Sequence, residues 1–279
     1  MKLKKKLAVI NVAFLVLAII NLCACNKDSS TANDVMHSYE HSNVGQKHND
    51  GLVGIYDIIK QSQKTKLTRD TKRDSCILAL TKQTINSFLQ EEFYNELEEL
   101  QIALECSETE TNAIIEKYNE ANAQPNTWFT KDTSKLTNKE IELLSYINDI
   151  LDRDSLILED VLNEFEIIRR RVALECTDNE ALIMNCALSI GIASSSYWCN
   201  NFDSWCTLLL GEHRGWFNWG NVVKEDIAGA VGGAIGGAAT GSLAGGIGAI
   251  PGAGVGALSG GLASSGTGAV IQIFNHYFD

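Results

Sequence analysis

The sequence predicts an all-α protein in which an acidic helical domain is followed by a glycine-zipper helical hairpin. Three observations support this fold class. Apolar residues between positions 74 and 105 recur at spacings of three and four, S/T-x-x-E motifs mark helix starts, and glycine recurs at every fourth position after residue 228. Only two prolines occur, and Pro125 lies in the polar stretch 119–135, which is the clearest connection between helices.

The first 24 residues have the features of a cleaved export signal. Lysine occupies four of the first six positions, and a charge-free run follows from 7 to 25. Its apolar part, 7–20, is shorter than the roughly 20 residues that a transmembrane helix needs. We therefore predict a signal peptide over 1–24.

Leu22, Cys23, Ala24 and Cys25 resemble the bacterial lipobox, in which an aliphatic residue and two small residues precede the cysteine that receives diacylglycerol. The resemblance implies that Cys25 is lipidated and that membrane lipid is a partner of the protein. It also implies a location in the bacterial cell envelope, with the leaflet left open. The alternative is an ordinary secretory signal, after which the mature chain would be free in solution.

Residues 25–50 are predicted to form a flexible lipidated tether. Ser, Asn, Asp and His dominate this segment and aliphatic residues are few, so it cannot bury enough surface to fold. His37 and His41 have H-x-x-x-H spacing, and His48 is nearby. Because no helical periodicity surrounds them, we predict free polar histidines and no metal site.

The mature chain is strongly acidic. Loss of residues 1–24 removes four lysines and no acidic residue, which leaves 19 basic against 35 acidic residues and a net charge of −16. A field of this sign repels phosphate backbones, so we expect no nucleic-acid partner. The segment 227–278 contains no Asp, Glu, Lys or Arg, and this change in composition marks a domain boundary.

An acidic helical domain is predicted over 51–196. Its helical spacing is clearest at Ile77, Leu78, Leu80, Ile85, Phe88, Leu89, Phe93, Leu97, Leu100 and Leu104. Capping boxes predict helix starts after three residues, and the pairs are Ser107 with Glu110, Thr137 with Glu140, and Thr177 with Glu180. The segments 103–110 and 173–180 also resemble each other. A duplicated helical hairpin explains this match, and chance recurrence of capping boxes is the alternative.

Residues 197–226 form a collar rich in aromatic residues and cysteine. Its aromatic residues are Tyr197, Trp198, Phe202, Trp205, Trp216, Phe217 and Trp219. Two interpretations stay open, a belt at the headgroup region of a bilayer and the core of a soluble domain.

Six cysteines remain in the mature chain besides Cys25, and they are Cys76, Cys106, Cys176, Cys186, Cys199 and Cys206. An even number permits a disulfide framework in an exported protein, and Cys199 with Cys206 is the closest local pair. Six free thiols are the alternative.

The hairpin, 227–279, has the most regular pattern in the chain. The first zipper run consists of Gly229, Gly233, Gly237, Gly241 and Gly245, and the second of Gly248, Gly252, Gly256 and Gly260, followed by Ser264 and Gly268. Such stripes suit close helix crossing of the GxxxG kind. Pro251 is predicted to divide the segment into two helices, 227–249 and 252–274, each about 34 Å long and able to cross a hydrocarbon core.

The glycine content requires compensation by packing. Sixteen glycines lie between Gly229 and Gly268, and each costs about 1 kcal/mol relative to Ala inside a helix. The strong apolar residues are too few for either helix to insert alone, so we expect insertion as a packed pair or an oligomer, with self-association through the zipper. A flexible Gly/Ala linker is the alternative.

The segment 223–237 resembles the glycine-zipper regions of class II bacteriocin-like peptides and of bacterial envelope proteins. The resemblance covers about 50 of 279 residues and implies a packing mode. Those bacteriocins are short, cationic and preceded by a double-glycine leader, whereas this chain is long and acidic. The resemblance therefore does not carry over a killing activity.

We expect a non-enzymatic cell-envelope lipoprotein whose hairpin associates with or inserts into a membrane. The motifs G-x-S-x-G, H-E-x-x-H and C-x-x-C are absent from the sequence, so no catalytic residue and no cofactor are predicted. One alternative is a bacteriocin-like factor that permeabilises membranes. Another is a soluble lipid-anchored binding protein, in which the glycine helices pack beneath the aromatic cluster.

Overall fold

The computed structural model describes residues 41–63, 71–119, 133–211, 219–243 and 248–278. Every regular element in this part of the chain is helical and none is a strand, which confirms the predicted all-α fold class. His41–Asp279 form one compact unit. Residues 1–40, with the predicted signal peptide, Cys25 and most of the predicted tether, lie outside the described residues.

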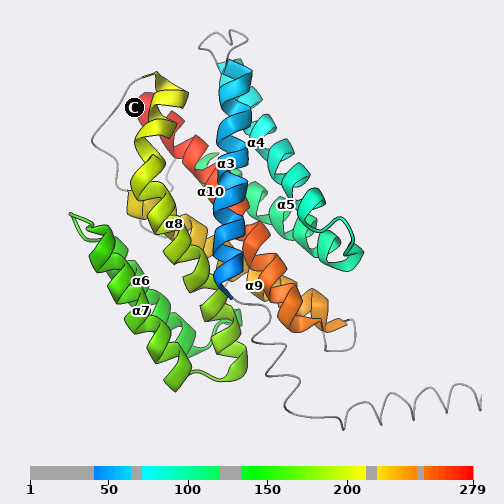
Figure 1. Ribbon diagram of the computed structural model, residues 1–279, viewed down its shortest axis with the longest axis vertical. Coiled ribbons are helices and arrows are strands. Elements are labelled where there is room, and N and C mark those ends of the chain that lie inside the picture. The colour runs from blue at the N-terminus through cyan, green and yellow to red at the C-terminus, as the bar shows by residue number, and fades with distance from the viewer. Residues whose placement is uncertain (1–40, 64–70, 120–132, 212–218, 244–247, 279) are drawn as a thin grey trace, which may run out of the picture. The chain divides into compact units, whose positions relative to one another are not determined.

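The helices are arranged around α10. In chain order they are α3 (His41–Gln63), α4 (Thr71–Glu92), α5 (Leu97–Asn119), α6 (Asn138–Leu151), α7 (Leu158–Glu175), α8 (Asp178–Leu210), α9 (Trp219–Leu243) and α10 (Ala249–Phe278), with a 3-10 helix at Thr133–Lys135. Figure 1 shows α10 inside the bundle, behind α3 and α8, with α4 and α5 on one side and α6 and α7 beside α8 on the other.

Two of the three predicted capping boxes start helices. The Glu140 carboxylate accepts from the backbone N–H of Thr137 at 2.7 Å, directly before α6. Glu180 accepts in the same way from Thr177, at 2.7 Å, before α8. Each box satisfies backbone donors that the first turn of a helix leaves free, so these two boundaries follow from the sequence.

The third predicted helix start, after Ser107, is wrong. α5 continues from Leu97 to Asn119 without a break, and Ser107 and Glu110 are both buried. Glu110 turns inward, where it accepts a hydrogen bond from Ser264 of α10 at 3.5 Å. The similar segments 103–110 and 173–180 therefore differ in structure, since one is the interior of α5 and the other the junction of α7 and α8.

The predicted tether, 25–50, extends too far along the chain. α3 begins at His41, and its inner face continues through residues that are all buried, namely Val44, His48, Leu52, Ile55 and Ile59. These positions have the spacing of three and four that defines one face of a helix. Residues 41–50 contain one aliphatic residue, Val44, so the polar composition of this first part of α3 resembles that of a linker.

α9 and α10 contact each other through their backbones along the glycine zipper. The facing pairs are Gly229 with Gly260, Gly233 with Gly256, Gly237 with Gly252, and Gly241 with Gly248. At each of these glycines, a Cβ atom would lie closer than 3.0 Å to the carbonyl oxygen of the partner glycine. The predicted zipper residues thus form an antiparallel helix pair, and Gly245 lies outside the described residues.

Pro251 does not divide the hairpin. It lies in the first turn of α10, which begins at Ala249, and α9 ends at Leu243. The first turn of a helix tolerates proline because its N–H groups have no partner within the helix. The predicted boundaries, 227–249 and 252–274, are therefore shifted.

α10 is enclosed by the other helices. Every residue from Gly252 to Ile271 is buried, and the helix packs against α3, α4, α5, α8 and α9. A small residue permits the close approach of α3 to α10, since a Cβ at Gly51 of α3 would lie 2.7 Å from the Leu262 side chain of α10. The glycine-rich helix is thus the centre of the core of this unit.

Among the described helices, α8 alone is long and apolar enough to cross a membrane by length and composition. Two thirds of its apolar window, 67%, is buried against the other helices. The core helix of a soluble protein passes the same test, so this finding does not identify α8 as a membrane span.

Two glycine substitutions on neighbouring positions of α9 test the backbone contact. We expect Gly233→Ala to destabilise the fold by about 1–3 kcal/mol, because its methyl group would meet the Gly256 carbonyl. Gly236→Ala should be neutral or stabilising by up to about 1 kcal/mol, because a Cβ there meets only the Cys106 Sγ atom, at 3.6 Å. Urea unfolding measures both. Equal effects of the two substitutions would show that the α9–α10 contact is not close packed.

Candidate functional site

The hairpin is the first candidate site, because its two helices have different surroundings. α10 is enclosed, whereas α9 has one face that reaches solvent. On that face Ala228, Gly232, Gly236 and Thr240 are partly exposed, and Ala239 and Ser242 are exposed. This face carries no charge, and no Asp, Glu, Lys or Arg occurs anywhere from 227 to 278.

The aromatic collar is divided between two helices. Its first part belongs to α8, where Tyr197, Trp198, Phe202 and Trp205 are all buried. The Trp198 and Trp205 rings lie 5.3 Å apart, and the Trp205 indole N–H donates to the Tyr197 hydroxyl at 3.0 Å. For these four residues the structure agrees with the core interpretation. Trp216 and Phe217 lie outside the described residues.

A buried polar cluster lies where α3, α8, α9 and α10 meet. At its centre is Asp226 of α9, whose side chain has no exposed surface. Its Oδ2 atom accepts hydrogen bonds from the Ser194 hydroxyl and, at 3.1 Å, from the Trp198 indole N–H. The same indole lies 3.1 Å from the Ser265 hydroxyl of α10. The cluster therefore joins the base of the hairpin to α8.

His48 completes the cluster from α3. Its side chain is fully buried, and its Nε2 atom lies 3.8 Å from Asp226 Oδ2. Burial raises the pKa of Asp226 to about 8, against the opposing effect of its hydrogen bonds with Ser194, Ser265 and Trp198. Burial lowers the pKa of His48 to about 4, so the ring is neutral at pH 7.

Neither residue is predicted from the sequence as part of a site. The prediction of a free histidine at position 48 is wrong, and Asp226 has no predicted role. The available signal was the helical spacing of Val44, Leu52, Ile55 and Ile59, which places His48 on their face. For Asp226, the signal was its position as the last charged residue before the uncharged segment.

Two further charged residues are buried at the base of the hairpin. The Lys224 side chain is only 7% exposed and forms an ion pair with Asp152 at the end of α6. Glu225, the next residue, is also buried. Charges are costly to bury unless they are paired, so the three consecutive residues 224–226 hold this end of α9 against its neighbours.

The predicted disulfide between Cys199 and Cys206 does not form in the structure. The six described cysteines are free thiols, with Cys199 exposed and Cys206 buried. Both belong to the continuous helix α8, where seven residues correspond to a rise of about 10.5 Å. A disulfide requires Cα atoms closer than about 7 Å, so this pairing would break the helix.

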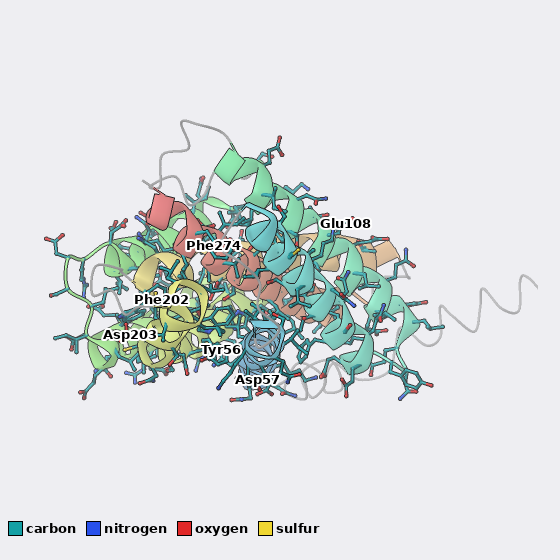
Figure 2. All side chains as sticks on the ribbon, turned by 90° about the horizontal axis from the view of Figure 1, so that it is seen from above. Tyr56, Asp57, Glu108, Phe202, Asp203 and Phe274 are labelled. Carbon is teal, nitrogen blue, oxygen red and sulfur yellow. The ribbon has the colours of Figure 1, made fainter. Side chains whose placement is uncertain are left out.

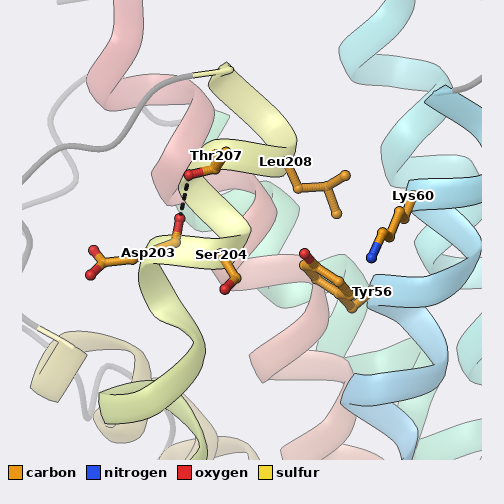
Figure 3. Close-up of a pocket in the computed structure, with 6 residues that line it drawn as sticks. All are labelled: Tyr56, Lys60, Asp203, Ser204, Thr207 and Leu208. Atoms are coloured by element: carbon orange, nitrogen blue, oxygen red, sulfur yellow. Dashed lines mark hydrogen bonds between the residues drawn. The ribbon is translucent and has the colours of Figure 1, made fainter.

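A shallow surface hollow of about 460 Å³ lies between α3 and α8. Figure 3 shows Tyr56 and Lys60 of α3 facing Ser204 and Leu208 of α8, with Asp203 and Thr207 at the far edge. Figure 2 shows Tyr56 and Phe202 on these two neighbouring helices. Lys60 Nζ lies 5.6 Å from the centre of the Tyr56 ring, and both charged side chains of the hollow are exposed. The hollow could bind a small polar molecule only weakly.

Among the described residues, no group of three or more His, Cys, Asp or Glu side chains is arranged to hold a metal ion. The geometry defines a helical bundle that encloses a glycine-zipper hairpin and fastens its base through buried polar groups. No protein-family model, curated protein or solved structure matches the chain.

The free thiols should differ sharply in reactivity. Burial raises the pKa of Cys186 and Cys206 to about 12, which leaves a thiolate fraction roughly 1000-fold smaller than that of an ordinary thiol. We therefore expect a brief iodoacetamide pulse to modify the exposed Cys76 and Cys199 and to leave Cys186 and Cys206 unmodified until urea is added. Peptide mass spectrometry measures each site. If Cys199 and Cys206 both resist iodoacetamide until a reductant is added, the two residues do form a disulfide.

Proposed function

We propose that this protein is a lipid-anchored bacterial envelope protein that stores a membrane-active glycine-zipper hairpin inside a helical bundle. The observation that supports this most directly is the α9–α10 contact. Four glycine pairs of the hairpin face each other, so the two helices contact each other directly along the whole zipper. Two helices in such contact can stay packed against each other both inside a water-soluble protein and in a lipid bilayer.

The polar groups of the hairpin also suit a nonpolar environment. The hydroxyls of Thr240, Ser242 and Ser259 each donate to a carbonyl of their own helix, at 3.0, 2.6 and 2.9 Å. They would therefore remain satisfied where water is absent. The apolar residues of α10 that now contact the surrounding helices include Val255, Leu258 and Leu262, and in a bilayer these would contact lipid tails.

The lipid on Cys25 would hold the bundle close to the membrane that it acts on. A single anchored molecule has a high effective concentration at the surface, so a hairpin with weak insertion energy can still reach the bilayer. The anchored form thus fits the modest apolar content of the two helices.

A soluble lipid-anchored binding protein is the second candidate function. It is favoured by the complete burial of α10 and by the side chains of Ser264 and Ser265, which bond to Glu110 and Trp198 of the surrounding helices. In this case the zipper would only build the core, and the hairpin would never leave it.

A charge placed on the exposed face of the hairpin separates these two functions. Ala239 is exposed in the bundle, so Ala239→Asp should leave the fold intact. In a bilayer the same charge costs about 3 kcal/mol, which corresponds to about 100-fold weaker partitioning. We expect this weaker partitioning when Ala239→Asp is introduced into residues 26–279 and binding to phosphatidylcholine vesicles is measured by flotation. Gln61→Asp, at an exposed position of α3, is the matched control.

If the parent chain does not bind vesicles, or if Ala239→Asp and Gln61→Asp bind as it does, the hairpin is not a membrane element and the soluble function stands. Release of a trapped dye during partitioning would favour the permeabilising, bacteriocin-like alternative. Partitioning without leakage would favour an anchoring or structural role.

The anchor has its own test with neighbouring cysteines. We expect Cys25→Ala to abolish incorporation of labelled palmitate in a bacterial host, because the lipid acceptor is gone. Cys23→Ala should keep the label, because alanine is a small residue suited to that position of a lipobox. The intact mass of the protein purified from the membrane fraction measures the modification. Label that persists in Cys25→Ala would refute the predicted anchor.

A further inference from the structure

The pair formed by His48 and Asp226 has an unusual arrangement at the base of the hairpin. Both side chains are fully buried, and they come from α3 and α9. Each has an atom without a hydrogen-bond partner, Nε2 of His48 and Oδ1 of Asp226. The contact between the two groups, from Nε2 to Oδ2, is 3.8 Å, which is longer than a hydrogen bond. Two unpaired buried polar groups at this separation are costly, and the cost is lower when a proton leaves both of them uncharged.

The neighbouring hydrogen bonds determine which atom of His48 faces Asp226 as an acceptor. The Asn49 amide N–H donates to the Ala193 carbonyl at 2.9 Å, which turns the amide oxygen of Asn49 toward His48. That oxygen lies 3.1 Å from His48 Nδ1, and because it can only accept, Nδ1 is the donor in this contact. The backbone of Gly261 on α10 also hydrogen-bonds to His48. The neutral ring then carries a lone pair on Nε2, the atom nearest the carboxyl group of Asp226.

One proton satisfies this arrangement. A proton on Oδ1 makes Asp226 neutral beside the His48 ring, while its Oδ2 atom continues to accept from Ser194 and Trp198. Without the proton, a buried carboxylate would face a lone pair, which is unfavourable. We propose that a single proton shared by His48 and Asp226 locks the base of the glycine-zipper hairpin into the bundle, and that loss of this proton at mildly alkaline pH releases the hairpin.

The charged groups around the pair do not replace this proton. They are Glu225 on α9, Glu110 on α5 near Ser264, Lys224 paired with Asp152 after α6, and Lys47 of α3 paired with Glu92 of α4. On α8, the pKa of Tyr197 is raised to about 12 by burial, so its hydroxyl stays neutral. α10 contributes no Asp, Glu, Lys or Arg. The two nearby lysines are therefore engaged elsewhere, and Glu225 adds repulsion.

The sign of the pH dependence follows from the two shifts. Asp226 contributes stability that is present below its ordinary pKa of 3.8 and is lost as the pH rises to about 8. His48 contributes stability that is present above its ordinary pKa of 6.5 and is lost as the pH falls to about 4. Between pH 4 and 6.5 the folded and unfolded pairs each hold one proton, so the effects cancel.

Above pH 6.5 the cancellation ends. The unfolded pair has lost its proton, whereas the folded pair keeps it until about pH 8. The folding equilibrium constant should therefore fall about tenfold through this pair as the pH rises from 6.5 to 8. Because Asp226 directly precedes the uncharged segment, the same change favours exposure of the hairpin.

Urea unfolding of residues 26–279 across this pH range tests the lock, and three variants show its origin. In Asp226→Asn, the neutral amide can donate to His48, so the tenfold fall should disappear. In His48→Gln, stability should already decline from pH 4 upward, because only Asp226 remains. Asp152→Asn, which breaks only the surface end of the Lys224 pair, should keep the parent's pH dependence.

The proposal is overturned if Asp226→Asn retains the tenfold fall. A measurement on the parent chain does not depend on how the variants fold. NMR titration should show the His48 ring neutral down to about pH 4, and a ring that titrates near its ordinary 6.5 would refute the lock.

The biological role of this lock rests on the proposed membrane function, but the lock itself does not. Vesicle flotation at pH 6.5 and 8 tests the lock and the membrane function separately. We expect more binding at pH 8 for the parent and no such increase for Asp226→Asn. If the stability changes occur as expected but no vesicle binding follows at either pH, the lock is supported and the membrane function is wrong.

Discussion

The fold depends on the contact between the glycine backbones of α9 and α10. At Gly233 and Gly256 there is no room for a side chain on either helix, so the two helices lie as close as their backbones allow. A pair this narrow leaves space for α3, α4, α5 and α8 to surround α10 on its other sides. The conformational cost of so many helical glycines is thus compensated twice, within the pair and through the packing of the shell.

The two ends of α9 have opposite requirements. Its first turns carry Lys224, which pairs with Asp152, and Asp226, which accepts hydrogen bonds from Ser194 and Trp198. Its later turns are uncharged, and their zipper glycines contact the backbone of the α10 glycines. The polar base therefore gives the hairpin a unique position, whereas the zipper alone would tolerate a slide by one four-residue step.

The sequence was sufficient for the fold class and for the choice of zipper glycines, because the spacing of four is a geometric property of the helix itself. It could not show that α10 lies at the centre. A helix rich in Gly, Ala and Ser has little contrast between its faces, so its pattern does not indicate how many neighbours it has. Ser107 and Glu110 show another limit of sequence-based prediction. The motif S/T-x-x-E occurs both in capping boxes and in buried polar pairs inside a helix, so the motif alone does not separate the two. His48 was missed for a related reason: a polar residue within an apolar stripe is recognised only after its partner is known.

The order of the helices along the chain has a consequence for biogenesis. α10 is synthesised after α3, α4, α5, α8 and α9, yet it supplies the surface on which all five pack. Until it emerges, the earlier helices can pack only against one another, as α3 does with α8 and α8 with α9, and their inner faces lack the helix that covers them. The complete core therefore forms only after the C-terminal helix has been made, so the position of one helix in the sequence sets the order of assembly.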